Sequence, residues 1–299
     1  MKSKRLYGNI LLMITAIIWG SAFVAQSVGM DHVGPFTFTA ARSFVGSLVL
    51  IPVIFLMDML RKKDGEEKTQ RDNKTLVMGG IACGIALCVA SSFQQMGIAY
   101  GTSSGKAGFI TALYILVVPI IGLALGKRVR PVIWLCVAMS IGGLYLLCVT
   151  DGLGSVQKSD LLVLICALCF AAHIQIIDYY SPKVDGVRMS CIQFFVCGVL
   201  ALIPAVLAEA PRWGDILLGA GPILYAGVMS SGVAYTLQII GQKHTNPTVA
   251  SMIMSLESVF ALLTGMIVLH QMPTVREMLG SAIMFAAIIL AQLPEKKRI

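Results

Sequence analysis

The sequence predicts an all-α membrane protein with ten transmembrane helices, arranged as two inverted five-helix repeats. Three observations support this fold class: an apolar composition, ten apolar stretches of membrane-spanning length, and basic residues gathered in alternate loops. Hydrophobic residues make up 57% of the 299 residues and charged residues only 13%, whereas a soluble domain carries about 25% charged residues. This composition excludes a water-soluble enzyme, a nucleic-acid-binding protein and a disordered chain.

A helix needs about 20 mostly apolar residues to cross the hydrocarbon core of a bilayer. Stretches of roughly this length follow one another along the chain, and the longest gap between them is the charged segment Asp58–Lys74. The ten predicted helices are Leu6–Val28, Pro35–Met57, Thr75–Ala99, Ser103–Gly126, Pro131–Val149, Asp160–Tyr180, Val187–Ala208, Ile216–Gly241, Thr245–Leu269 and Val275–Leu293.

Lys and Arg are distributed unevenly between the loops. Of the 23 basic residues, 18 lie at the termini and in one set of alternate loops, four lie in the other set, and Arg42 lies within a predicted helix. Cytoplasmic loops are enriched in basic residues. Both termini are therefore predicted to be cytoplasmic, in a multi-pass protein of the plasma membrane. An odd number of helices would place the basic clusters on opposite sides, so their distribution also supports an even number.

The second half of the chain resembles the first half. Gly46–Pro52 and Gly198–Pro204 are identical at five of seven positions. Each half holds five predicted helices, so the second half enters the membrane upside down, as in many secondary transporters. We predict two repeats, residues 1–150 and 151–299. At an offset of 143 residues, Gly84, Gln95, Thr102, Ala107, Ile110, Leu113 and Gly122 fall on Gly227, Gln238, Thr245, Ala250, Ile253, Leu256 and Gly265.

Four short motifs resemble those of the drug/metabolite transporter superfamily, specifically its EamA-type members. Trp19–Phe23 is similar to the W-G-[ST]-x-[FY] signature, and Ala41–Arg42 to the A-R pair of the second helix. Thr102–Ala107 resembles the small-residue start of the fourth helix, and Leu256–Ala261 the L-E-P-V-x-A run of the ninth. The resemblance covers nearly the whole chain. It implies ten helices, two EamA repeats and solute movement by alternating access, often as metabolite export. Ser258 stands where proline is usual, so the usual kink of the ninth helix is not assured.

Charged side chains inside the membrane are the strongest site candidates, because burying one costs about 2.5–3.5 kcal/mol on insertion scales. Glu257 lies near the middle of the ninth predicted helix. It is a candidate proton-coupling carboxylate or a partner for a cationic group of a substrate; the alternative is a hydrogen-bonded residue that locks two helices together. Arg42 could bind a substrate carboxylate, or it could pair with backbone carbonyls or extend to the interface.

Six further residues are candidates to line a substrate cavity. Trp19 lies in mid-helix, away from the interfaces where Trp concentrates, and Ser21 follows it. Gln residues, including Gln94, are unfavourable in a membrane without partners, and two of them occupy equivalent positions in the two repeats. The alternative for all of these residues is ordinary helix packing. The six candidates are Trp19, Ser21, Gln95, Tyr114, Tyr235 and Gln238.

The function predicted from the sequence is secondary transport of a small polar metabolite, such as an amino acid or a related compound, with export as the favoured direction. The expected partners are this substrate, the lipid bilayer and protons as coupling ion, without nucleic acid. No cofactor and no metal are expected, since Cys166 and Cys169 lack further ligands at metal-binding spacing. No Walker motif or nucleophile elbow occurs, so an enzyme is not expected. The alternative is a non-transporting membrane protein that mediates interactions or handles lipids.

Overall fold

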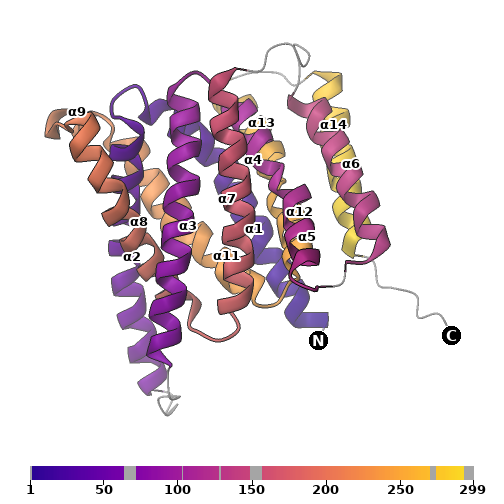
Figure 1. Ribbon diagram of the computed structural model, residues 1–299, viewed down its shortest axis with the longest axis horizontal. Helices are drawn as coiled ribbons and strands as arrows, with labels where there is room; N and C mark the ends of the chain where they lie inside the picture. The colour runs from indigo at the N-terminus through magenta and orange to yellow at the C-terminus, as the bar shows by residue number, and fades with distance from the viewer. Residues whose placement is uncertain are drawn as a thin grey trace.

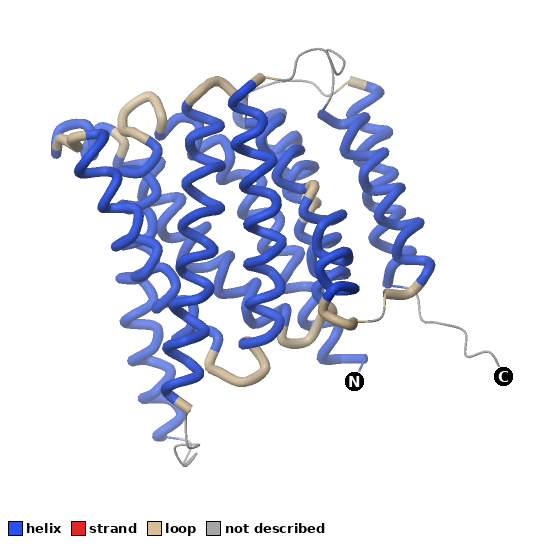
Figure 2. The backbone as a smooth tube through the Cα atoms, in the orientation of Figure 1, coloured by secondary structure: helices blue, strands red, loops and turns tan. Residues whose placement is uncertain are grey.

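The computed structural model describes residues 2–63, 72–102, 104–127, 129–148, 157–269 and 274–292. Within these ranges the chain forms helices joined by short turns, with no strand (Figures 1 and 2). Eight helices are long and apolar enough to cross a membrane, and Pro131–Gly143 and Met278–Ala291 are shorter apolar helices. The predicted all-α membrane fold is thus confirmed. The predicted repeat boundary at residue 150 lies outside the described residues.

The first half of the chain forms α1 (Lys2–Gly29), α2 (Pro35–Lys63), α3 (Asn73–Ala99), α4 (Ser104–Ala112), α5 (Tyr114–Ala124) and α6 (Pro131–Cys148). The second half forms α7 (Lys158–Tyr180), α8 (Gly186–Pro204), the π-helical turn η2 (Ala205–Glu209), α9 (Trp213–Leu218), α10 (Ala220–Tyr225), the π-helix η3 (Ala226–Ala234), α11 (Tyr235–Gln242), α12 (Pro247–Met254), α13 (Glu257–Leu269) and α14 (Val275–Gln292).

The fourth and ninth predicted helices are each broken into two half-helices. One break lies at Leu113, whose N–H donates to the Ile110 carbonyl at 3.2 Å, three residues back instead of four. The other lies at Ser255–Leu256, where Leu256 donates to Ile253 in the same way, also at 3.2 Å. Such tight turns interrupt the regular ladder of an α-helix. The ninth helix is therefore broken although Ser258 replaces the usual proline, and Leu113 and Leu256 are equivalent positions of the repeat.

The two halves run in opposite directions and are interwoven. In Figure 1, α1 begins at the end of the bundle where α7 ends. The helices of one half pack mainly against those of the other: α7 packs against α3 and α5, and α1 against α11 and α13. We call α3, α4, α5 and α7 the α7 bundle, and α1, α10, η3, α11, α12 and α13 the α1 bundle. The pairs α2–α8 and α6–α14, together with η2 and α9, make up the rest of the described helices.

Side-chain contacts repeat with the same symmetry. Thr102 Oγ1 donates to Asp160 Oδ1 at 2.9 Å, and Thr245 Oγ1, at the equivalent position, donates to Asn9 Oδ1 at 3.0 Å. Each contact ties the turn before a broken helix to the first helix of the opposite repeat. Asp160 also forms an ion pair with Lys106 Nζ at 2.6 Å. The two bundles are thus held together internally by matching polar contacts.

The carboxylate of Glu209 caps α2 from the opposite repeat. Glu209 Oε1 accepts a hydrogen bond from Phe36 N at 2.8 Å, and Oε2 accepts from Thr37 N at 2.7 Å and from Thr37 Oγ1 at 2.6 Å. Gly34 precedes the helix and has no side chain that could act as a cap, so the first N–H groups need an acceptor from elsewhere. A negative charge is also favourable at this end of a helix. Glu209 therefore fixes the start of α2 to the end of η2.

A Glu209→Gln variant is expected to lose about 1–2 kcal/mol of stability, because its amide NH2 would face backbone donors. Thermal unfolding of the purified protein in detergent measures this as a lower midpoint. The matched control is Asp31→Asn, which removes one charge from an exposed side chain in the turn before α2. Equal midpoints for the two variants would contradict the capping role.

Candidate functional site

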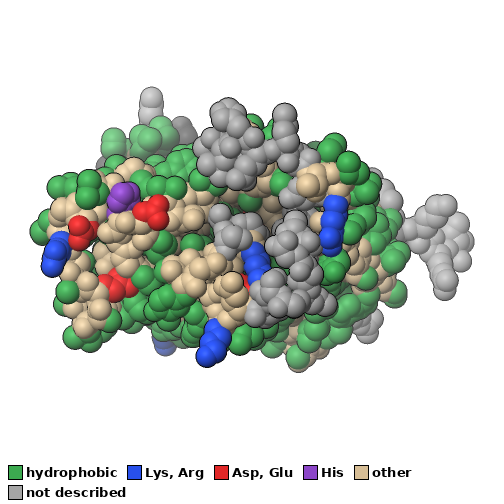
Figure 3. Space-filling view, turned by 90° about the horizontal axis from the view of Figure 1, so that it is seen from above, with side chains coloured by type: hydrophobic (Ala, Val, Ile, Leu, Met, Phe, Trp, Pro, Cys, Tyr) green, Lys and Arg blue, Asp and Glu red, His purple; other side chains and the backbone are tan. Residues whose placement is uncertain are grey.

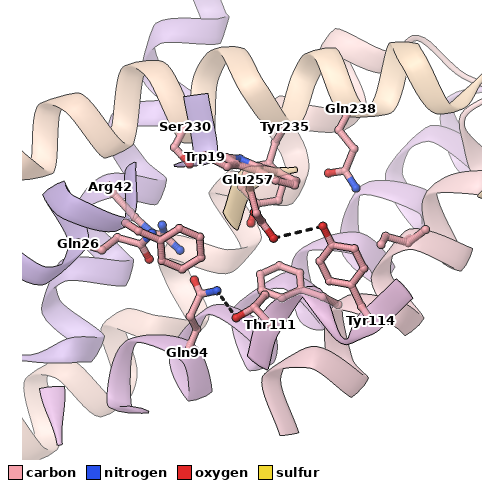
Figure 4. A pocket seen from close by; sticks show the side chains of 13 residues that line it. Trp19, Gln26, Arg42, Gln94, Thr111, Tyr114, Ser230, Tyr235, Gln238 and Glu257 are labelled. Carbon is pink, nitrogen blue, oxygen red and sulfur yellow. Dashed lines mark hydrogen bonds between the residues drawn. The ribbon is translucent and has the colours of Figure 1, made fainter. Parts of the chain in front are cut away.

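A cavity that is partly open to solvent lies between the two bundles (Figure 4). Its walls come from both repeats, and they include both half-helix breaks and the middle of α1. The lining residues are Trp19, Phe23 and Gln26 of α1, Arg42 of α2, Gln94 of α3, Thr111 of α4, Tyr114 of α5, Phe170 and Ile174 of α7, Ser230 of η3, Tyr235 and Gln238 of α11, and Glu257 of α13.

Glu257 and Tyr114 meet where the two breaks face each other. Each is the first residue of its half-helix, α13 or α5, and the two are 143 residues apart, which is the offset of the repeat. Tyr114 Oη donates a hydrogen bond to Glu257 Oε1 at 3.2 Å, and both side chains are almost fully buried (Figure 4). Half-helices that begin at a central site direct the positive ends of their dipoles toward it. The pseudo-twofold axis therefore passes through a polar contact inside the cavity.

Arg42 reaches the cavity from α2, on the side where Gln26 and Gln94 lie (Figure 4). Its side chain is only 3% exposed, and its guanidinium lies 6.0 Å from the centre of the Phe38 ring. In the described ranges, the ion pairs of the protein involve other cations, and Arg42 Nε has no hydrogen-bond partner. Arg42 thus contributes a buried positive charge that the surrounding protein leaves unpaired.

Aromatic rings form one wall of the cavity. The rings of Trp19 and Tyr235 lie 4.6 Å apart between centroids, and Phe194 supports Tyr235 from behind at 5.3 Å. His173 lies 6.1 Å from the same tyrosine ring, and its Nε2 is 3.1 Å from Gln193 Oε1. Tyr235 is therefore held by packing on several sides, which fixes the shape of this wall.

Several buried polar atoms of the lining residues have no hydrogen-bond partner within the described chain. Most buried polar groups in proteins are hydrogen-bonded, and an unsatisfied one costs about 1–3 kcal/mol. Four of the twelve such side-chain atoms in the described ranges belong to residues that line this cavity, where a solute with polar groups can pair with them. These atoms are Trp19 Nε1, Gln26 Oε1, Arg42 Nε and Gln238 Oε1.

Six of the eight predicted site residues line the cavity, and two do not. Ser21 donates to the Ile18 carbonyl at 2.8 Å and lies 2.5 Å from Tyr225 Oη. Gln95 is fully buried, and its Nε2 donates to the backbone carbonyl of Gln26 at 3.2 Å. The six lining residues are Trp19, Arg42, Tyr114, Tyr235, Gln238 and Glu257.

Sequence reasoning missed part of the lining, although the repeat offers a signal for two of these residues. Aligning Asn9 with Asp160 gives an offset of 151 residues, which places Trp19 on Phe170 and Phe23 on Ile174. Both members of each of these two pairs line the cavity. The other residues that received no role carry no comparable signal, because the rotation of a helix about its axis decides what its side chains face. They are Phe23, Gln26, Gln94, Thr111 and Ser230.

The described residues contain no group of three or more His, Cys, Asp or Glu side chains that could hold a metal ion. Cys166 and Cys169 are both free thiols, and Cys166 is buried. The chemistry of the cavity thus comes from one guanidinium, one carboxylate, amides, hydroxyls and aromatic rings. Such a set binds solutes through charge and hydrogen bonds.

Comparison with known proteins agrees with this architecture. The sequence profile of the EamA-like transporter family matches residues 6–149 and 157–293, and the chain belongs to this family of membrane transporters. A protein described as an uncharacterized transporter from Archaeoglobus fulgidus is 30% identical, over 97% of this chain and 87% of its own length. The uncharacterized transporter YoaV of Bacillus subtilis is 23% identical, over 93% and 94%. A solved crystal structure superposes with a TM-score of 0.74 at 19% identity, over 97% of this chain and 98% of that chain, which shows the shared fold.

Proposed function

We propose that this protein is a secondary transporter that moves a small polar metabolite, such as an amino acid or a related compound, across the plasma membrane by alternating access. The observation that carries the proposal is the polar cavity between the two bundles, where two broken helices meet at Tyr114 and Glu257. Broken helices around a central site at a repeat interface are typical of secondary transporters.

The contacts across the cavity support a movement of the two bundles against each other. Near the C-terminal ends of α1 and α3, Gln95 of α3 donates to the carbonyl of Gln26 on α1 at 3.2 Å. At the C-terminal end of α11, Gln242 donates to the carbonyl of Ile174 on α7 at 3.1 Å, and Gln238 Nε2 donates to Gln242 Oε1 at 3.0 Å. Separating the bundles at one end while the other end stays closed would expose the cavity to one side.

Glu257 is our proposed proton-coupling residue. It is the only carboxylate among the described residues that line the cavity, and Tyr114 is its hydrogen-bond donor there. A carboxylate can bind either a proton or the cationic group of a solute, but not both at once. A transporter that returns across the membrane only with one of the two bound therefore moves the proton and the solute in opposite directions. An inward proton gradient would then drive export.

The proposed orientation places both termini in the cytoplasm. Among the described residues, each half contains four helices long enough to cross a membrane and one shorter apolar helix. The turns that follow α7 and α11 lie at the end of the bundle where α1 begins (Figure 1). The loops at that end belong to the set that carries most of the basic residues. The opposite end, seen from above, shows scattered charges of both signs within a hydrophobic rim (Figure 3). This asymmetry agrees with the enrichment of Lys and Arg in cytoplasmic loops.

Metabolite profiles test the proposal. The medium and the cell extract of cells that express the protein are compared with those of cells carrying an empty vector and of cells expressing Glu257→Gln at the same membrane level. The expected result is one class of compound that accumulates in the medium with the wild-type protein alone. Identical profiles in all three cultures would contradict export, and a non-transporting membrane function would then take its place.

A further inference from the structure

We infer that Arg42 binds the carboxylate of the transported solute, and that the solute is a monocarboxylate with a hydrogen-bond donor and an apolar side group. The inference rests on the proposed transport function and adds the residue that selects the substrate. It depends on three features of the cavity: an unpaired buried cation at one side, a set of acceptors at another side, and aromatic walls between them.

The buried state of Arg42 demands a counter-charge. Arginine stays protonated in proteins, and a buried charge without a partner is destabilising by several kcal/mol. The one carboxylate that lines the same cavity, Glu257, accepts its hydrogen bond from Tyr114 and forms no ion pair with Arg42. Gln26 and Gln94, which lie beside the guanidinium, are neutral (Figure 4). An anionic group of a solute would supply the missing charge.

The number of positive charges favours a carboxylate over a phosphate. Arg42 is the only Lys or Arg among the described residues of the lining. One guanidinium balances one negative charge, and its planar fork matches a carboxylate with two parallel hydrogen bonds. A phosphate dianion would bring a second negative charge into a low-dielectric cavity that already contains Glu257, where an unbalanced charge is strongly unfavourable.

The acceptors of the cavity define the second group of the solute. Glu257 offers a carboxylate, and Gln238 Oε1 is buried with no donor from the described chain. Both lie away from Arg42 in Figure 4, on the side of Tyr114. Acceptors need donors, so an ammonium or another N–H or O–H group of the solute fits there. A zwitterion would satisfy the cation and the carboxylate of the cavity together.

The walls between these two sides are aromatic. Trp19 and Tyr235 pack against each other at a tilt of 56° on one wall, and Phe23 and Phe170 also line the cavity. Such surfaces bury apolar groups and stack with rings. The apolar part of the solute would contact these rings while its charged groups reach the polar ends.

Binding to the purified protein tests the inference. The chain has three tryptophans, so changing Trp134 and Trp213 to Phe leaves Trp19 as the reporter of ligand entry. The probes are matched in size: L-phenylalanine against L-phenylalaninamide and phenethylamine, L-leucine against L-leucinamide, and 3-phenylpropanoate as a carboxylate without an amine. We expect L-phenylalanine and L-leucine to change the Trp19 emission saturably. The amides and the amine, which lack the carboxylate, should bind about tenfold or more weakly, the ratio for a loss of about 1.4 kcal/mol. 3-Phenylpropanoate keeps the carboxylate but lacks the donor, so it should bind more weakly than L-phenylalanine and more tightly than phenethylamine.

Variants of Arg42 separate recognition from folding. Arg42→Gln should bind acid and amide alike, whereas Arg42→Lys should keep a weaker preference for the acid, because a lysine keeps the charge but loses the two-pronged geometry. Lys183→Gln is the control, since it removes one positive charge from an exposed residue outside the cavity. Unchanged thermal midpoints would show that the variants fold.

Equal binding of acids and amides by the wild-type protein would overturn the inference, and so would a preference for acids that survives in Arg42→Gln. A lack of response to every carboxylate would overturn the proposed substrate class. If the metabolite profile showed export of a compound without a carboxylate, the proposed substrate class would be wrong, but the proposed transport function would be supported. Failure of both experiments would instead reject transport itself.

Discussion

A Glu257→Gln variant is expected to lose proton-driven solute accumulation while it still inserts and folds. Glutamine has nearly the same shape and still accepts a hydrogen bond from Tyr114 Oη, but it cannot carry a proton in exchange for the cationic group of the solute. A pH difference of one unit is worth about 1.4 kcal/mol, which corresponds to roughly a tenfold concentration ratio for one proton exchanged. Wild-type protein in proteoliposomes should therefore accumulate solute up to about tenfold on the acidic side, and the variant should only equalise the two concentrations.

Two control variants make this result specific. Tyr114→Phe removes the hydrogen bond to Glu257 but keeps the carboxylate, so its transport should still respond to the pH gradient. Glu209→Gln removes a carboxylate that lies outside the cavity, and its coupling should match the wild type. The same gradient-driven accumulation in Glu257→Gln and in wild type would contradict the coupling role of Glu257.

The second large effect is expected from a single methyl group at Gly20. A Cβ atom built on Gly20 would lie 2.6 Å from Phe260 Cβ and 2.7 Å from both Ala261 N and the carbonyl oxygen of Glu257. Two of these three atoms belong to the backbone, so α1 and α13 must separate to admit it. Overpacking of this kind costs about 1–3 kcal/mol. Because α13 starts at Glu257, the separation should also reshape the cavity.

Gly20→Ala is therefore expected to lower the thermal midpoint and to reduce transport strongly, although alanine favours a helix over glycine by about 1 kcal/mol. Gly142→Ala is the matched control, because Gly142 lies within α6 and has no neighbouring atom within 4 Å of an added Cβ. That variant should be as stable as wild type or slightly more stable. If Gly20→Ala were equally well tolerated, the close contact between α1 and α13 would not be required.

The positions of the eight membrane-length helices and of the two shorter apolar helices in the described ranges were predictable, because hydropathy reports directly on burial in a bilayer. The positions of the two breaks were not predictable, because the local sequence carries no signal for them. Leu113 is an ordinary helix former, and Ser258 replaces the proline that would have suggested a kink. The offset of 143 residues pairs Leu113 with Leu256. Once one break is known, the repeat therefore predicts the position of the other, but it does not predict the first. Packing against the opposite repeat, and not local propensity, decides both.

The site was predictable where a residue is conspicuous in a membrane. Arg42 and Glu257 carry charges, and Trp19 and Tyr235 carry polar groups on large rings. Gln95 and Gln238 show the limit of this reasoning. They occupy equivalent positions, yet Gln238 lines the cavity whereas Gln95 turns to the backbone of Gln26. Thr111 and Ser230 were missed because small hydroxyl residues commonly bond within their own helix, and only the rotation of the helix directs them to the cavity.

Cysteine labelling from each side of the membrane tests the central claim, that this cavity is a solute pathway opened alternately to the two sides. Ser230→Cys is a nearly isosteric change at a lining residue, made in a background without the eight native cysteines. Ser140→Cys is the control, because Ser140 is fully buried in α6 and does not line the cavity. A membrane-impermeant thiol reagent should modify Ser230→Cys in both right-side-out and inverted vesicles and block transport, while Ser140→Cys stays unmodified. Protection of Ser230→Cys from both sides would contradict the pathway, because it would make the cavity a sealed space between packed helices.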